Sequence, residues 1–80
     1  MLVPHKTLLK RIAACEALAE KAYDAMYDSR YPAGEYSDLK DYFREAIDLA
    51  ERAGLTAEAE RLSQRLEHCK AVYRKQFTQS

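Results

Sequence analysis

The chain has 80 residues, with 13 basic and 13 acidic side chains and only two glycines and two prolines. A chain of this length forms one domain, whose core is too small to enclose a deep active-site cavity. Zero formal net charge removes the positive field that drives non-specific nucleic-acid binding. The scarcity of Gly and Pro, together with abundant Ala, Glu, Lys and Arg, indicates an all-α fold.

A first helix is expected over residues 5–30. Pro4 suits a first helical turn, and Pro32 disfavours helix at the residue before it. Apolar residues recur between them at spacings of three and four, which places them on one buried face. Residues 1–3 are expected to fray. The predicted buried face comprises Leu8, Ile12, Cys15, Ala19, Ala22 and Met26, with Leu18 and Ala25 at its edges.

A loop is expected over residues 31–36, because Pro32 and Gly34 stand where a type I turn favours proline and glycine. Ser37 or Asp38 is the predicted cap of a second helix over residues 37–53. Gly54 is predicted to close that helix in the left-handed conformation. The predicted buried face comprises Leu39, Phe43, Ala46, Ala50 and Ala53, with Tyr42, Ile47 and Leu49 at its edges.

A third helix is expected over residues 56–77, with Thr56 as its N-cap and residues 78–80 frayed. The short turn at Gly54 makes the second and third helices antiparallel neighbours. We therefore predict a single domain over residues 1–80, an up-down-up antiparallel three-helix bundle. The third buried face comprises Ala59, Leu62, Leu66, Cys69 and Tyr73, with Val72 beside it.

The run from Tyr36 to Ala50, YSDLKDYFREAIDLA, is closed by Gly54 and followed by a long charged helix. It resembles the tetratricopeptide-type (TPR-like) helical hairpin and its three-helix relative, the MIT domain. Both families are non-catalytic and bind short helical or extended peptides in grooves between helices. The resemblance covers about half of the chain, which has no 34-residue repeat. It implies an interaction module and assigns no contact residue.

No set of residues in the sequence requires a particular chemistry. His5 and His68 lack the helical spacing of metal sites in bundles, and two isolated glycines provide no phosphate-binding loop. We therefore expect no catalytic activity, no cofactor and no metal. No apolar run approaches the roughly 20 residues needed to cross a bilayer, and two cysteines indicate no disulfide framework. We expect a cytoplasmic protein without a membrane partner.

Cys15 and Cys69 both lie on predicted buried faces. Because the first and third helices run in the same direction, the two thiols are expected at similar heights in the bundle. They are either small apolar core residues or a redox-sensitive pair. A redox-responsive thiol protein is therefore the alternative functional hypothesis, and a nucleic-acid-associated helical factor is the third.

Glu16, Glu20, Asp24 and Asp28 follow one another at four-residue spacing. Each like-charged step should destabilise the helix by about 0.2–0.5 kcal/mol, and acids near a helix C-terminus oppose its dipole. The row is either a solvated face or a binding surface, and replacing Glu20 and Asp24 by Lys is expected to leave the fold unchanged or slightly more stable.

Tyrosines flank this row and either cover the end of the bundle or belong to the binding surface. The leading hypothesis is a small non-catalytic protein that docks a protein partner, such as a basic segment, or a second copy of itself. The candidate partner surface comprises Glu16, Glu20, Tyr23, Asp24, Tyr27, Asp28 and Tyr31.

Overall fold

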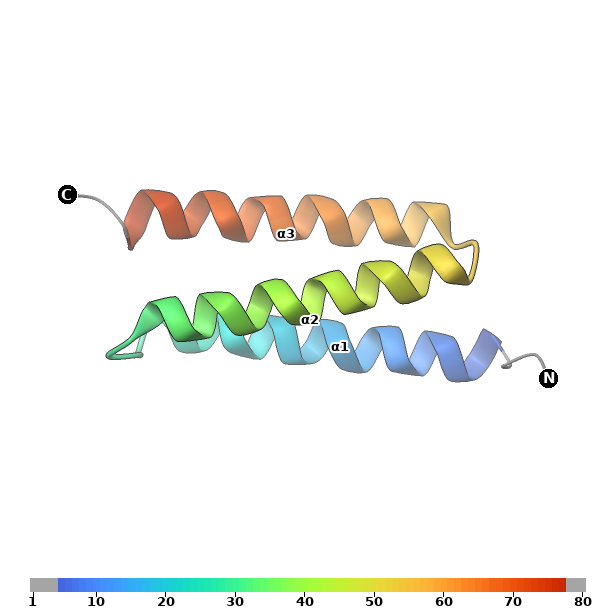
Figure 1. Ribbon diagram of the computed structural model, residues 1–80, viewed down its shortest axis with the longest axis horizontal. Coiled ribbons are helices and arrows are strands. Elements are labelled where there is room, and N and C mark those ends of the chain that lie inside the picture. Colours follow the sequence, from blue (N-terminus) through green and yellow to red (C-terminus); the bar gives the residue numbers. More distant parts are fainter. Residues whose placement is uncertain (1–4, 78–80) are drawn as a thin grey trace.

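The computed structural model describes residues 5–77, which form three α-helices in up-down-up order (Figure 1). The helices are α1 (His5–Met26), α2 (Pro32–Arg52) and α3 (Thr56–Gln76). They form a rod of 50 × 19 × 14 Å in which α2 packs against both α1 and α3. The predicted all-α three-helix bundle is confirmed. The predicted fraying of residues 1–3 and 78–80 lies outside the described residues.

The first helix ends earlier than predicted, at Met26 rather than near Arg30. After Met26, backbone N–H groups donate to carbonyls three residues earlier, as in the hydrogen bond of 3.4 Å that the Ser29 N–H donates to the Met26 carbonyl. The Ser29 hydroxyl then accepts a hydrogen bond of 3.0 Å from the Tyr31 N–H. These local bonds satisfy the backbone as the chain leaves α1, so no further helical turn is needed.

The second helix begins at Pro32, so most of the predicted loop over residues 31–36 is helical. Pro32 occupies the first turn, where its missing N–H costs no hydrogen bond and its fixed φ suits the helix. Tyr31 precedes it without a side-chain cap. The predicted caps, Ser37 and Asp38, instead lie inside α2. The prediction was wrong because Pro-Ala-Gly fits a turn and a first helical turn equally well.

Gly54 ends α2 with φ of +74°, as predicted. The Leu55 N–H donates a hydrogen bond of 2.9 Å to the Ala50 carbonyl, and the Gly54 N–H donates one of 3.0 Å to the Glu51 carbonyl. This pair of bonds is the Schellman motif, which satisfies the carbonyls at a helix end. Thr56 is the first residue of α3 rather than its N-cap, a position that Leu55 occupies without a side-chain bond.

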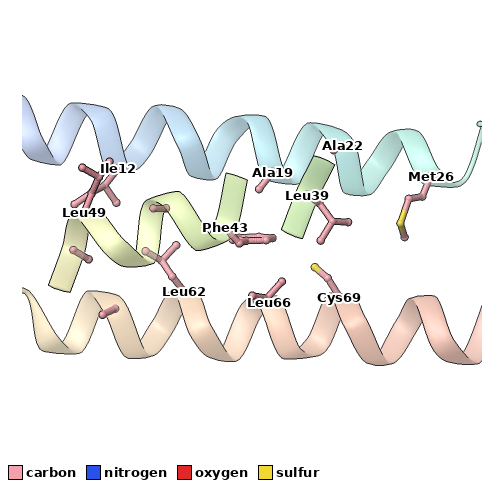
Figure 2. Close-up of a cluster of buried hydrophobic side chains, with 13 residues drawn as sticks. Ile12, Ala19, Ala22, Met26, Leu39, Phe43, Leu49, Leu62, Leu66 and Cys69 are labelled. Atoms are coloured by element: carbon pink, nitrogen blue, oxygen red, sulfur yellow. The ribbon is translucent and has the colours of Figure 1, made fainter. Parts of the chain in front are cut away.

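The core lies along the axis between the three helices (Figure 2). Most of the predicted buried faces are confirmed, but Leu18, at the edge of the α1 face, is 44% exposed. Small side chains in α1 and α2 allow these two helices to pack closely. No helix in the described part of the chain is apolar over enough length to cross a bilayer. The buried core comprises Ile12, Ala19, Ala22, Met26, Leu39, Phe43, Ala46, Leu49, Ala50, Ala59, Leu62, Leu66 and Cys69.

Candidate functional site

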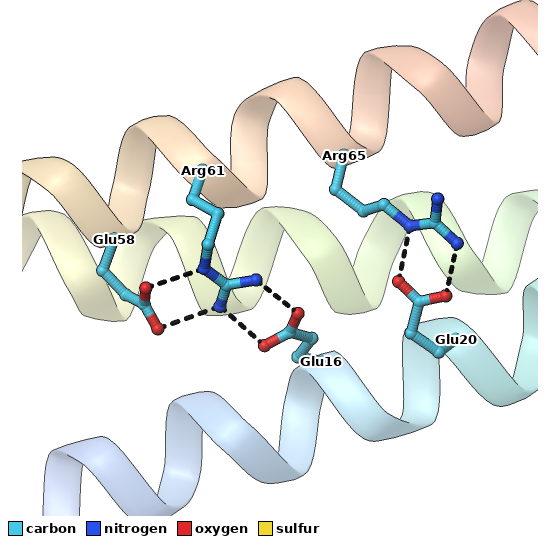
Figure 3. A network of polar contacts seen from close by, with 5 residues as sticks. All are labelled: Glu16, Glu20, Glu58, Arg61 and Arg65. Carbon is cyan, nitrogen blue, oxygen red and sulfur yellow. Dashed lines mark hydrogen bonds and ion pairs between the residues drawn. The ribbon is translucent and has the colours of Figure 1, made fainter.

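Two arginines of α3 reach across the bundle to two glutamates of α1 (Figure 3). Arg61 donates two hydrogen bonds of 2.8 Å to Glu16, and it also binds Glu58 of its own helix. Arg65 donates two bonds of 2.7 Å to Glu20. Paired guanidinium–carboxylate bonds are the strongest and most directional of the charged contacts. Long side chains therefore hold α1 and α3 together.

These bridges change the interpretation of the acidic row. Glu16 and Glu20 are half-buried in contacts within the chain, so half of the predicted partner row has a folding role. The hydrogen bonds from Arg61 hold the pKa of Glu16 below its usual value. Replacing Glu20 by Lys would put two cations together and is expected to destabilise the fold, the opposite of the expectation from an isolated helix.

The two arginines were not singled out from the sequence. A signal for them was present, because Arg61 and Arg65 repeat the four-residue spacing of Glu16 and Glu20. On parallel helices such matched spacing allows two bridges at once. The signal identifies partners only when the relative height of the two helices is known.

Five aromatic rings from all three helices form a continuous chain at one end of the bundle. The Tyr23 and Tyr27 hydroxyls lie 3.1 Å apart, and Tyr27 meets Phe77 with ring centroids 5.4 Å apart. Phe77 stacks on Tyr73 at 5.9 Å, and Tyr73 on Tyr36 at 3.8 Å. The hydrogen bond with Tyr27 raises the pKa of Tyr23 to about 12. These contacts favour the interpretation that tyrosines cover the bundle end.

Part of the predicted surface is left outside these contacts. Tyr27 is 50% exposed and Tyr31 is 71% exposed, although Tyr31 lies close to the Gly34 backbone. Asp24 and Asp28 are exposed beside them, and neither carboxylate has an ion-pair partner among residues 5–77. We call Asp24, Tyr27, Asp28 and Tyr31 the acidic edge.

The acidic edge stands at the unfavourable end of α1. Asp24 lies in the last turn and Asp28 just beyond it, where the partial negative charge of the helix dipole opposes a carboxylate. Arg61 and Arg65 compensate the two earlier acids of the row, but no described cation compensates these two. The fold therefore carries a local electrostatic cost at this edge.

The two cysteines do not lie at similar heights, so this prediction is wrong. Both Arg–Glu bridges join residues 45 positions apart, which places Cys69 level with Asp24. Cys15 is nine residues away from that level, about 13 Å along the bundle, whereas a disulfide needs Cα atoms within about 7 Å. Burial raises the pKa of Cys69 to about 11, and burial together with Glu45 raises that of Cys15. The thiols are free and separate.

Shallow hollows lie on either side of α2, and two of them are lined by residues other than His and Cys. Within residues 5–77, no group of three or more His, Cys, Asp or Glu side chains could hold a metal ion. His68 is exposed. The hollow between α1 and α2, of about 250 Å³, is lined by Leu18, Lys21, Ala22, Ala25, Glu35 and Tyr42. The hollow between α2 and α3, of about 400 Å³, is lined by Glu51, Thr56, Ala59, Glu60 and Ser63.

Comparison with protein families, with curated proteins and with solved structures finds no match to this chain. The likeness to TPR-like hairpins and MIT domains therefore stays a resemblance carried by the residues Tyr36 to Gly54.

Proposed function

We propose that the protein is a non-catalytic cytoplasmic interaction module that binds a basic segment of a protein partner at the acidic edge. The observation that carries the proposal is the contrast along the acidic row of α1. Glu16 and Glu20 are paired with arginines of the same chain, whereas Asp24 and Asp28 are exposed and have no ion-pair partner among residues 5–77. Carboxylates that disfavour their own helix and lack an internal counter-charge are suited to an external one.

The neighbouring tyrosines support the same surface. Tyr27 and Tyr31 present large rings to solvent, and tyrosine offers contact area while losing little side-chain entropy. A lysine or arginine can place its charge on the carboxylates and its aliphatic stem on a ring. The acidic edge thus combines an attractive charge with an apolar contact. Nucleic acid is not part of the proposal, because this edge would repel phosphate.

The test compares the wild type with Asp24→Asn/Asp28→Asn as bait in a cell extract. The matched control is Asp38→Asn/Asp41→Asn, which removes two exposed acids from α2. Identified partners that depend on the acidic edge should be recovered by the wild type and the control, and lost with the first variant.

Each such partner is then titrated against the three proteins at low and high salt. The wild type should bind at least about tenfold more tightly than Asp24→Asn/Asp28→Asn at low salt, with a smaller ratio at high salt. Equal affinity of the two proteins at both salt concentrations would show that the acidic edge does not bind the partner.

A further inference from the structure

The outward face of α1 carries its own basic counterpart to the acidic edge. Lys6 and Lys10 are exposed in the first half of the helix. Neither is ion-paired in the part of the chain that the structure describes. Asp24 and Asp28 lie at the other end of the same helix. The face is therefore basic at one end and acidic at the other, and neither charge is ion-paired with a residue that the structure describes.

Small apolar side chains separate the two charged ends. Ala14 and Ala17 are exposed. They follow Lys10 by four and seven positions, and Asp24 follows Ala17 by seven, so these residues share a face of the helix. Alanine lets a second helix approach to the short end of the usual 8–10 Å range of axis separations. Lys21 follows Ala17 by four positions and is a charged residue on the same face.

We propose that the basic partner is a second copy of this chain, whose α1 docks antiparallel on this face about a two-fold axis at Ala17. The inference rests on the proposed function, because it identifies the basic segment that the acidic edge receives. Lys10 and Asp24 each lie seven residues, about 10 Å, from that axis along the helix, and Lys6 and Asp28 each lie eleven residues from it. Lys10 of one copy therefore faces Asp24 of the other, and Lys6 faces Asp28. The two-fold axis repeats each contact.

The charge pattern selects this orientation. A parallel pair would set Lys10 against Lys10 and Asp24 against Asp24, which repel, whereas the antiparallel pair joins opposite charges at both ends. Exposed ion pairs are individually weak and are screened by salt. The dimer should therefore be in equilibrium with the monomer and should dissociate as salt increases.

Reciprocal charge exchange tests the proposal. In one variant, Lys6→Glu/Lys10→Glu, the basic end becomes acidic; in the other, Asp24→Lys/Asp28→Lys, the acidic end becomes basic. Both changes agree with the dipole of α1, so both proteins should fold, which circular dichroism checks. The matched control is Arg44→Glu/Lys75→Glu, which makes the same charge change at exposed positions of α2 and α3.

Sedimentation equilibrium is measured for each protein alone and for an equimolar mixture of the two exchanged variants. The wild type and the control should dimerise, each exchanged variant alone should dimerise at least about tenfold more weakly, and the mixture should form a one-to-one heterodimer. Raising salt from about 50 to about 500 mM should weaken wild-type dimerisation about tenfold.

A wild type that stays monomeric up to near-millimolar concentration would overturn self-docking. If that monomer still binds an identified basic partner through Asp24 and Asp28, the proposed function survives and only the identity of the segment is wrong. Dimerisation that is equally strong in the exchanged variants, or a mixture that forms no heterodimer while the wild type dimerises, would also overturn the antiparallel arrangement.

Discussion

The bridge between Glu20 and Arg65 should contribute more to stability than an ordinary surface ion pair. The test replaces each residue by Gln, singly and together, in a double-mutant cycle. Both side chains are about one-third exposed, and two bonds of 2.7 Å join them across the bundle. Exposed pairs contribute about 0.2–1 kcal/mol, and charged hydrogen bonds about 1.5–3 kcal/mol. For this intermediate exposure we expect a coupling energy of about 1–2 kcal/mol.

Urea unfolding of the four proteins measures the coupling energy. In thermal unfolding, each kcal/mol of stability lost should lower the melting temperature by about 4–8 °C in a domain of this size. Arg65 also lies over the ring of Tyr23, but that contact is absent from both arginine variants and cancels in the cycle. The control is the pair of Asp48 and Arg52 on α2, which is 55% and 75% exposed and should give about 0.3–0.5 kcal/mol. Equal coupling in the two cycles would refute the inference that the bridge holds α1 and α3 together.

Gly54→Val should lower the free energy of unfolding by about 1–3 kcal/mol in denaturant titrations, because valine is strained at the positive φ of this position. Steric overlap adds nothing, since no heavy atom lies within 4 Å of an added Cβ. An unchanged midpoint would mean that α2 ends differently. Arg61 lowers the pKa of Glu16 in the folded state, so the ionised carboxylate stabilises the fold. This contribution is fully present above the ordinary pKa of 4.5 and is lost as the pH falls through the lower pKa of the folded state. Glu16→Gln should therefore be less stable than the wild type at neutral pH, and a gap that persists at about pH 2 would contradict this. Iodoacetamide should modify the half-buried Cys15 before the buried Cys69. Mild oxidation should produce no disulfide within a monomer. Mass spectrometry measures both the order of modification and the mass of the oxidised monomer.

Apolar periodicity was sufficient to predict which faces of the helices are buried. Ile12, Phe43 and Leu66 lie in the core because spacings of three and four allow only one side of a helix to be apolar. Gly54 was predictable for a similar local reason, since a left-handed residue after a helix favours glycine. Leu18 was misplaced because it lies at the edge of that pattern, where tertiary packing decides exposure.

The features that failed prediction depend on how the helices sit against one another. Pro32 fits either a turn or a first helical turn, and only the packing of α2 on α1 decides between them. The relative height of α1 and α3 decides that Glu16 meets Arg61 and that Cys15 lies far from Cys69. Residues 45 positions apart leave no local pattern of their own, so the division of the acidic row into paired and unpaired halves required the structure.

The central claim is that Asp24 and Asp28 serve binding and not folding. The most direct measurement determines both properties on one protein, Asp24→Asn/Asp28→Asn. Its denaturant midpoint should equal or exceed that of the wild type, because each acid near the end of α1 opposes the helix dipole by about 0.3–1 kcal/mol. Its affinity for the partner that the wild type recovers should fall at least about tenfold. A lower midpoint with unchanged affinity would contradict the account and give these carboxylates a role in the fold.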